Sequence, residues 1–451
     1  ITGNADANTI RGGAGNDTLN GGGGGDTFLV SGSGEGSDVY NGGDGNDTIK
    51  AQSNGTFIQL AGNFGAGNSI ETITNDGKTN VTVLGDSTSN TLNFSSTTLT
   101  DVVVNGGSGN DTITGNAAAN TLRGGEGADT IRGSAGDDAL FGDGGNDTFT
   151  VVGSGDGLDT VNGGTGNDTW LGIGGADVFY VTSGLGNLTL IENINGGAST
   201  DQIIATAGDD VLDFSTGPTL TSIEEIIGGA GNDTITGNAD SNTIRGSAGT
   251  DTLTGGNGDD TFTVVGSGDG LDTVVDGGDG NDTWLGIGGA DVFYVTSGLG
   301  NLTSIENING GASTDHIIAT AGDDVLDFSV GPTLTSIEEI IGGNGNDTIT
   351  ASTSVATSYR GSAGIDTFIV TTTSAESTIL DFDDAGDDRI DLTSFGLSAA
   401  QLQALTSQVG VDIRIDLTSA NGSGGAGSGD IVLVGTSLAS LDFSGATDFI
   451  I

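Results

Sequence analysis

The chain has 451 residues, with 61 acidic and nine basic side chains, a formal net charge of −52 and 87 glycines. So much negative charge with few aromatic residues is by itself typical of a disordered chain, and it excludes a basic nucleic-acid-binding surface. The absence of cysteine excludes disulfides and thiolate metal sites, and no stretch approaches the roughly 20 apolar residues of a membrane span. Carboxylates at this density repel one another, so an ordered structure requires a bound counter-cation.

A nonapeptide of the form G-G-x-G-x-D-x-U-x, where U is apolar, recurs along the chain. Its glycines permit the positive φ of tight turns and let backbone carbonyls converge. Its aspartate supplies a hard oxygen ligand of the kind that calcium prefers, and its apolar residue can point into a core. We therefore predict one turn and one short strand per nonapeptide, so that two nonapeptides close a coil of about 18 residues and the coils stack about 4.8 Å apart.

The N-terminal part, residues 1–105, is predicted to be a diverged super-repeat. Nonapeptide matches begin at Gly12, Gly21 and Gly42, and residues 90–107 parallel residues 210–229. The first residues, ITGN, repeat residues 235–238 but lack the glycine-rich turn that precedes that second copy. We therefore expect these 451 residues to be the C-terminal part of a longer protein.

Residues 106–227 and 228–341 are near copies and are predicted to be two further super-repeats. The first begins with five consecutive nonapeptides and the second with four, and both contain the sequence DTWLGIGGADVFYVTSGLGNLT. The segments between nonapeptide blocks, such as 184–197 and 219–229, contain short β-prone runs with fewer acidic turns. We expect them to form further coils that lack metal on one side.

The pattern changes towards the C-terminus. Residues 342–380 are predicted to form the last coils, and residues 381–451 a cap and an export region. An uncapped stack would expose strand edges and aggregate, so we expect this region to cover the open end.

One helix is predicted in this cap, over Ser398–Val409. Ser398 and Gln401 have the spacing of a capping box, and Leu402, Leu405 and Val409 fall on one face of the helix.

The nonapeptide resembles the calcium-binding repeat of RTX proteins, and the resemblance covers most of the chain. It implies an all-β fold: a right-handed parallel β-roll, or β-helix solenoid, with a C-terminal cap that contains one short helix. It also implies several bound Ca2+ ions as cofactors. The side chains that match the ligand position are Asp17, Asp26, Asp47, Asp111, Asp129, Asp138, Asp147, Asp168, Asp177, Asp210, Asp233, Asp251, Asp260, Asp282, Asp291, Asp324, Asp347 and Asp366.

Two members of this set, Asp210 and Asp324, lie in the partial repeat TAGDDVLDF and are weaker candidates. Backbone carbonyl ligands are expected from glycines that open a nonapeptide, namely Gly12, Gly106, Gly124, Gly142, Gly228, Gly255 and Gly342.

Four arginines occur in nonapeptides that lack the expected ligand aspartate. Arg11, Arg123 and Arg245 each close a nonapeptide whose ligand aspartate is asparagine, and Arg360 follows Ser358 in the same way. We interpret the guanidinium as neutralising carboxylates of the neighbouring coil in place of calcium. A stripe of arginines for lateral self-contact, or a simple solubilising role, are the alternatives.

The sequence argues against catalysis. His316 is the sole histidine, and Gln202 stands at its position in the preceding super-repeat. A catalytic triad would need that replaceable histidine, and no HExxH zinc motif is present. We therefore expect that the chain is not an enzyme.

The predicted function is that of a secreted structural protein that folds on meeting extracellular calcium. By resemblance it serves as a surface-layer, filament, adhesin or matrix element outside, or at the surface of, a Gram-negative bacterium. The expected partners are calcium ions, further copies of the chain, the type I secretion machinery and a cell-surface polysaccharide, with no nucleic acid and no membrane span. The alternative is a non-catalytic calcium-binding module of a longer secreted protease, lipase or epimerase.

Overall fold

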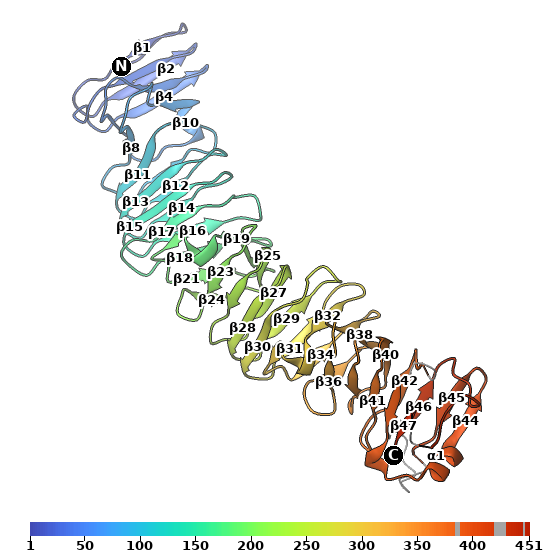
Figure 1. Cartoon of the computed structure of the whole chain (residues 1–451). Coiled ribbons are helices and arrows are strands. Elements are labelled where there is room, and N and C mark those ends of the chain that lie inside the picture. The colour runs from blue at the N-terminus through green and yellow to red at the C-terminus, as the bar shows by residue number, and fades with distance from the viewer. Residues whose placement is uncertain (384–387, 419–429, 445–446) are drawn as a thin grey trace. The chain divides into compact units, whose positions relative to one another are not determined.

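The computed structural model describes residues 1–383, 388–418, 430–444 and 447–451 (Figure 1). The chain divides into two compact units, the first of residues 1–206 and 216–226 and the second of residues 207–215 and 227–451. Part of the predicted C-terminal cap, residues 384–387, 419–429 and 445–446, lies outside the described residues. The super-repeat boundaries drawn from the sequence stay predictions.

Unit 1 is a solenoid of short parallel strands, in which each strand pairs with strands of the coils before and after it (Figure 1). One stack contains β1 (Thr9–Ile10), β3 (Thr27–Val30), β5 (Thr48–Ala51), β7 (Thr72–Thr74) and β10 (Thr98–Thr100), and β2 (Thr18–Gly23) pairs with β4 (Val39–Asp44). A second contains β6 (Phe57–Gln59), β8 (Thr82–Leu84), β11 (Val103–Ser108), β13 (Thr121–Glu126), β15 (Ala139–Gly144), β17 (Thr160–Asn162) and β20 (Leu188–Thr189). A third contains β9 (Thr91–Asn93), β12 (Thr112–Thr114), β14 (Thr130–Arg132), β16 (Thr148–Val151), β18 (Thr169–Gly172), β21 (Asn193–Asn195) and β24 (Thr219–Thr221). β19 (Val178–Val181) pairs with β22 (Gln202–Ala205), and two 3-10 turns, η1 (Ala66–Asn68) and η2 (Ser183–Leu185), lie between strands.

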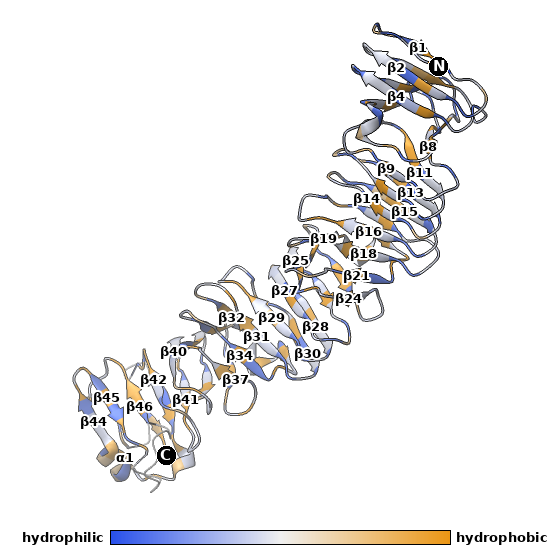
Figure 2. Cartoon of the chain, turned by 180° about the vertical axis from the view of Figure 1, so that it is seen from behind, coloured by the Kyte–Doolittle hydropathy of each residue, from blue (hydrophilic) through white to orange (hydrophobic). Residues whose placement is uncertain are grey.

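Each strand contributes a narrow strip of core. In the third stack the register places Ile113 beside Ile131, and Phe149 beside Trp170. These side chains are at most 2% exposed, while the threonines before them face outwards or are half-buried. Figure 2 shows the hydrophobic residues concentrated along the strands. The period-2 alternation of the repeat therefore forms strands because one apolar residue per strand can stack on its equivalent in the next coil.

Unit 2 repeats this architecture (Figure 1). One stack contains β23 (Val211–Asp213), β26 (Thr234–Thr236), β28 (Thr252–Asn257), β30 (Val274–Asp279) and β33 (Leu302–Thr303), and another β27 (Thr243–Ala248), β29 (Thr261–Val264), β31 (Thr283–Gly286), β34 (Asn307–Asn309) and β37 (Thr333–Thr335). A third contains β32 (Val292–Val295), β35 (His316–Ala319), β38 (Glu339–Asn344), β40 (Thr357–Ala363), β42 (Ser377–Ile379) and β46 (Ile431–Leu433), and a fourth β36 (Val325–Asp327), β39 (Thr348–Thr350), β41 (Thr367–Ile369), β43 (Arg389–Asp391) and β47 (Phe449–Ile450). Strand β25 (Glu225–Ala230) crosses the division between the units, and η3 (Ser297–Leu299) and η4 (Thr393–Phe395) are 3-10 turns.

The C-terminal end of unit 2 departs from the parallel pattern. β45 (Asp412–Ile415) pairs antiparallel with β46 and with β44 (Thr406–Val409), so the last stack ends in an antiparallel sheet. Reversed strands of this kind close a solenoid edge that would otherwise template further pairing.

The helix in this region is shorter than predicted. Helix α1 covers Ala399–Leu405, with Ser398 as N-cap and the expected capping box to Gln401. Thr406–Val409 form strand β44 instead, and Val409 is 56% exposed rather than on a buried face. The prediction failed there because pairing with β45 satisfies the backbone groups that a longer helix would have used.

The fold class is confirmed: the described residues form a mostly β, parallel solenoid with one short helix near the C-terminus. Coil length varies more than the nonapeptide suggests. Equivalent residues are 18 apart between Asp129 and Asp147, 21 between Asp147 and Asp168, and 24 between Asp168 and Glu192. The two-nonapeptide coil is therefore the minimum, and longer turns are added without breaking the strand register.

Turn glycines are required where two coils touch. Gly127 has φ of +132°, and a Cβ there would overlap the backbone carbonyl of Gly109 in the preceding coil. We expect Gly127→Ala to destabilise the folded protein by about 2 kcal/mol or more, because both backbone strain and steric overlap oppose it. Denaturant unfolding in calcium measures the change. Gly34→Ala is the control, since Gly34 has no neighbour within 4 Å of the added methyl and no positive φ; equal effects of the two substitutions would contradict this account.

Candidate calcium sites

The aspartates that precede the strands form hydrogen-bonded columns, which we call carboxylate ladders. In each ladder the backbone N–H of one rung donates to a carboxylate oxygen of the equivalent residue one coil later. The longest runs through unit 1, with N···O distances of 2.6 to 2.8 Å, along Asn90, Asp111, Asp129, Asp147, Asp168 and Glu192.

Other ladders follow the same rule. In unit 1 they join Asn8, Asp26, Asp47 and Glu71; Asp17 and Asp38; Asn120, Asp138 and Asp159; and Asp177, Asp201 and Glu224. In unit 2 they join Asp210, Asp233, Asp251 and Asp272; Asn242, Asp260, Asp282 and Glu306; Asp291, Asp315 and Glu338; and Asp324, Asp347, Asp366 and Asp388.

The second carboxylate oxygen of most rungs has no protein partner. Among the described residues, a buried Oδ2 without any hydrogen bond occurs in Asp17, Asp26, Asp47, Asp111, Asp129, Asp138, Asp147, Asp168, Asp177, Asp201, Asp233, Asp251, Asp260, Asp282, Asp315 and Asp347. A buried carboxylate oxygen without a partner is costly in free energy, so each of these atoms needs a ligand that the protein chain does not supply.

The first glycine of the turn leaves room beside that oxygen. A side chain at Gly142 would overlap Oδ2 of Asp147 and the carbonyl oxygen of Gly163 in the next coil, and Gly106 stands in the same relation to Asp111 and Gly124. A carboxylate oxygen and a backbone carbonyl thus converge on a cradle that exists only because the residue has no Cβ.

These features fit a calcium ion. Calcium takes six to eight oxygen ligands, from carboxylates and backbone carbonyls alike, in flexible geometry. No group of three or more His, Cys, Asp or Glu side chains gathers among the described residues, so a bound ion would draw most of its ligands from turn carbonyls. When bound, the ion would supply the positive charge that the paired coils lack.

The predicted aspartates are thus brought together in ladders, but four differ from the rest. The partnerless Oδ2 is not found in Asp210, Asp291, Asp324 and Asp366. In Asp291 both oxygens accept backbone N–H groups, from Gly266 and Gly288, and in Asp324 both lie within reach of the Thr320 hydroxyl. The assignment of all the aspartates and glycines as ligands stays a prediction.

Sequence reasoning missed several rungs. Asp201 and Asp315 have the partnerless Oδ2, and Asp38, Asp159 and Asp272 are buried rungs too. None of these aspartates follows the complete glycine pattern G-G-x-G-x of the nonapeptide. The signal that finds most of them is the pattern of an aspartate two residues before a buried apolar residue, as with Asp201 before Ile203.

Glutamate closes several ladders. Glu71, Glu192 and Glu306 each accept the backbone N–H of the last aspartate at 2.7 to 2.8 Å. Pro218 and Pro332 occupy the equivalent positions one coil after Glu192 and Glu306, directly before strands β24 and β37. Proline has no side-chain oxygen to accept the glutamate N–H and no N–H of its own to donate, so the ladder stops at the glutamate.

The ladders hold carboxyl groups away from water. Burial raises the pKa of Asp138 to about 7 and of Asp159 and Asp272 to about 8, with nearby carboxylates adding to the effect. Burial also raises the pKa of Asp129 and Asp147 to about 6. Loss of hydration is the main cause in every case, since the charged form is disfavoured in a low-dielectric surrounding.

The arginines contact acidic residues of a neighbouring coil, as expected. The Nε atom of Arg11 lies 2.9 Å from Glu35 Oε1, that of Arg123 lies 2.9 Å from Asp143 Oδ2, and that of Arg360 lies 2.7 Å from Glu339 Oε1. The acidic partners are not rungs of a ladder, however. The guanidinium groups of these three arginines therefore neutralise carboxylates outside the ladders.

His316 has a structural environment. Its Nε2 lies 3.7 Å from Glu339 Oε2, and Gln202 makes the equivalent contact to Glu225 at 2.8 Å. Glutamine and histidine thus fill the same position against a glutamate.

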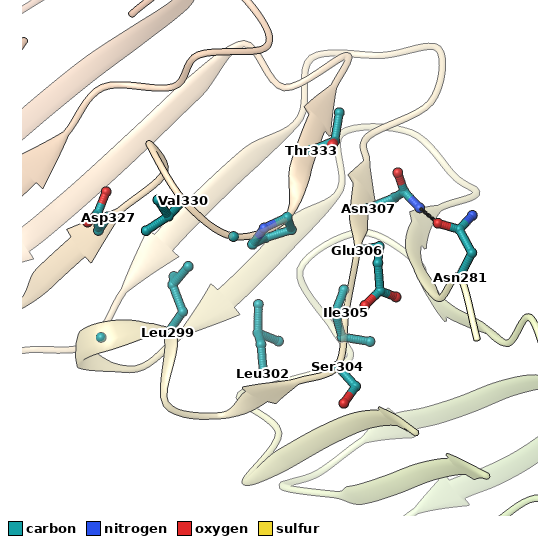
Figure 3. A pocket seen from close by; sticks show the side chains of 13 residues that line it. Asn281, Leu299, Leu302, Ser304, Ile305, Glu306, Asn307, Asp327, Val330 and Thr333 are labelled. Atoms are coloured by element: carbon teal, nitrogen blue, oxygen red, sulfur yellow. Dashed lines mark hydrogen bonds between the residues drawn. The ribbon is translucent and has the colours of Figure 1, made fainter. Parts of the chain in front are cut away.

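The two units have a shallow groove at equivalent positions. In unit 2 it has a volume of about 740 Å³ and is lined by Leu299, Leu302, Val330, Pro332, Glu306 and Asn307. Figure 3 shows Leu299, Leu302 and Val330 on one side of the groove and Glu306 and Asn307 on the other, with Asn307 hydrogen-bonded to Asn281 at 3.3 Å. Val330 is 72% exposed, and the groove gathers neither a histidine nor a nucleophile with an adjacent base. Its geometry does not suggest a reaction.

Taken together, the fold and the ladders define a class of protein, a parallel β-solenoid whose turns are built for calcium. Eight segments match the family described as RTX calcium-binding nonapeptide repeat, namely residues 1–28, 33–53, 103–127, 114–149, 190–218, 227–262, 303–331 and 335–353. These segments of the chain are therefore similar to RTX calcium-binding nonapeptide repeats, a type that is typical of secreted proteins.

Comparison with individual proteins adds little. No curated protein sequence matches the chain. Among solved structures, the extracellular lipase LipA from Serratia marcescens shares 14% identity over 80% of this chain, with a TM-score of 0.17, and the chain spans 45% of the length of that lipase. In the described part of the chain, no helix is long and apolar enough to cross a membrane.

Removing one rung tests the ladder. Asp147→Asn keeps an oxygen that can accept the Asp129 N–H but removes the carboxylate charge beside the cradle. We expect fewer bound calcium ions per chain and a loss of about 1–3 kcal/mol in calcium-saturated stability, measured by native mass spectrometry and urea unfolding. Asp44→Asn is the control, because Asp44 is exposed in a turn of the same type. An unchanged ion count in the Asp147 variant would contradict the assignment.

The raised pKa values predict that, without calcium, the folded state loses stability as the pH rises. A carboxyl whose pKa rises on folding is more protonated in the folded state, so the stability due to that protonation is present at low pH and lost as the pH rises through the folded pKa. With pKa values of about 6 to 8 against about 4 in the unfolded chain, the calcium-free protein should be more folded at pH 5 than at pH 8. Circular dichroism in a chelator measures this.

Calcium and protons compete for the same oxygens, so the calcium affinity should rise over the same pH interval. An affinity that is constant from pH 5.5 to 8 would show that the buried carboxylates do not bind the ion.

Proposed function

We propose that this chain is a secreted structural element that is unfolded at low calcium and folds on meeting extracellular calcium. It then serves as a surface-layer, filament, adhesin or matrix component. The observation that carries this proposal is the set of buried, partnerless Oδ2 atoms in the carboxylate ladders.

The energetics support calcium-triggered folding. Each coil adds only a few buried apolar side chains, while many of its residues are glycines that lose the most conformational entropy on folding. The ladders also bring like charges together in a chain of net charge −52. A bound cation is the term that reverses this balance, because its binding free energy becomes folding free energy.

A non-catalytic role fits the geometry of the side chains. The sole histidine contacts a glutamate, the chain contains no cysteine, and the grooves are shallow. The chemistry that the described residues offer is repeated oxygen ligation, which suits a load-bearing or spacing element.

Self-association is supported by exposed apolar residues that recur at equivalent positions of the two near copies, residues 106–227 and 228–341. Ile173 and Ile287 are 46% and 49% exposed at equivalent positions, and Val211 and Val325 are 48% and 51% exposed. Exposed apolar groups at a regular sequence interval are typical of contacts between copies, once calcium has reduced the charge repulsion.

Folding should depend on calcium at near-neutral pH. In a chelator at pH 7.5 the chain should give the far-ultraviolet spectrum of an unfolded protein, and calcium should convert it to a β spectrum with a midpoint of about 10⁻⁴ to 10⁻³ M, the range of extracellular modules. Magnesium at the same concentration is the control, since it accepts irregular carbonyl cages poorly. A β spectrum that persists in excess chelator would sink the proposal.

The structural role has a separate readout. Electron microscopy and light scattering after calcium addition should show sheets or filaments, whereas a strictly monomeric folded protein would restrict the proposal to a calcium-folded module without assembly.

A further inference from the structure

Four turns have asparagine at the ladder position, and we call them the Asn turns. They comprise residues 3–8, 85–90 and 115–120 in unit 1 and residues 237–242 in unit 2, with the sequences GNADAN, GDSTSN, GNAAAN and GNADSN. Their shared pattern is a glycine, then asparagine or aspartate, and an asparagine at the sixth position.

All four Asn turns are closed by the same hydrogen bonds. In the turn of residues 115–120, the Asn116 N–H donates to Asn120 Oδ1 at 2.8 Å, and Asn120 Nδ2 donates to Asn116 Oδ1 at 3.0 Å. The Ala118 N–H donates to Asn116 Oδ1 at 2.9 Å. The other three turns repeat these bonds at 2.8 to 3.2 Å.

The oxygen beside the cradle therefore differs between the two kinds of turn. A side chain at Gly115 would overlap Asn120 Oδ1 and approach the carbonyl of Gly133, as one at Gly106 would overlap Asp111 Oδ2 and approach the carbonyl of Gly124. The aspartate oxygen has no partner, but the asparagine oxygen accepts an N–H from its own turn. The amide group thus satisfies internally what the carboxylate leaves to a cation.

The backbone differs as well. In the turn of residues 106–111, Gly107 and Gly109 have φ of +110° and +118°. At the equivalent positions of the Asn turn, neither Asn116 nor Ala118 has a positive φ. The Asn turns therefore lack the left-handed residues that let carbonyls converge in the Asp turns.

The Asn turns of residues 85–90, 115–120 and 237–242 each stand at the start of a ladder, and the Asn turn of residues 3–8 donates to a ladder in the same way. The N–H groups of Asn8, Asn90, Asn120 and Asn242 donate to Asp26, Asp111, Asp138 and Asp260 at 2.6 to 2.7 Å. The Asn turn thus presents a donor to the first carboxylate while its own side chain is already bonded within the turn.

We propose that the four Asn turns are calcium-free starting points of the carboxylate ladders, which form before calcium binds and on which the first calcium-binding coil assembles. The side chain of the sixth-position asparagine replaces the cation. Its amide N–H donates to the side-chain oxygen of the second residue of the turn, and its own oxygen accepts a backbone N–H of the turn. This inference rests on the proposed calcium-driven folding. Calcium is expected to bind at the turns with aspartate at the ladder position, and not at the Asn turns.

Converting one Asn turn into an Asp turn is the first test. The full-length variant Asn116→Gly, Ala118→Gly, Asn120→Asp restores the repeat sequence GGAGAD over the retained Gly115 cradle. We expect one additional calcium ion per chain by native mass spectrometry, together with an increased dependence of folding on calcium. An unchanged ion count in the folded variant would overturn the inference.

Breaking one Asn turn is the second test and does not depend on creating a site. Asn116→Ala removes the acceptor of the Ala118 N–H and of the Asn120 amide. We expect the same number of bound ions but a severalfold higher calcium midpoint of folding, because the starting coil is no longer formed beforehand. Loss of an ion, or an unchanged midpoint, would overturn the proposal.

Ala117→Ser is the matched control, since Ala117 is exposed and an exposed serine, Ser87, occupies this position in the turn of residues 85–90. Its ion count and midpoint should equal those of the unsubstituted chain. If the unsubstituted chain itself binds no calcium, the proposed function fails. If it binds calcium, but the triple variant and Asn116→Ala have the same ion count and midpoint as the unsubstituted chain, only the inference about the Asn turns fails.

Discussion

The structure depends on one electrostatic constraint, the stacking of buried carboxylates directly above one another. Most aspartate rungs give one oxygen to the backbone N–H of the coil before them and keep the other buried without a donor. The first oxygen fixes the register between coils. The second makes the same contact unfavourable until a cation arrives, so register and metal dependence come from the same side chain.

The chain uses several devices to control this constraint. Glutamate, with its longer side chain, is the last rung of ladders such as the one that ends at Glu192. Pro218 occupies the equivalent position one coil later and can neither accept nor donate the next hydrogen bond. Asparagine starts ladders with its oxygen already bonded, as in Asn120. Arginine acts beside the ladders, since Arg123 pairs with Asp143 and lies 4.8 Å from the ring of Phe141. Local charge is thus set rung by rung within a uniform backbone.

The small core has a consequence for how such a protein responds to its surroundings. Apolar residues stack one per strand, so neighbouring coils contribute similar and modest amounts to stability. Ion binding then adds a term at each interface that varies with the calcium concentration and the pH. Under the proposed function, a protein of this design would pass from a disordered to a folded repeat without any change in covalent structure.

The repeat, the strand positions and most ladder aspartates could be predicted from the sequence, because a period of nine with a fixed glycine and aspartate leaves few backbone solutions. The start of the C-terminal helix at Ser398 could be predicted too, since a capping box is a local signal. The end of that helix, the rungs outside the repeat pattern such as Asp201, and the partners of each oxygen became visible only in the folded structure. Those properties depend on what the next coil places beside a residue, and residues 18 to 24 positions apart are not compared by any local pattern.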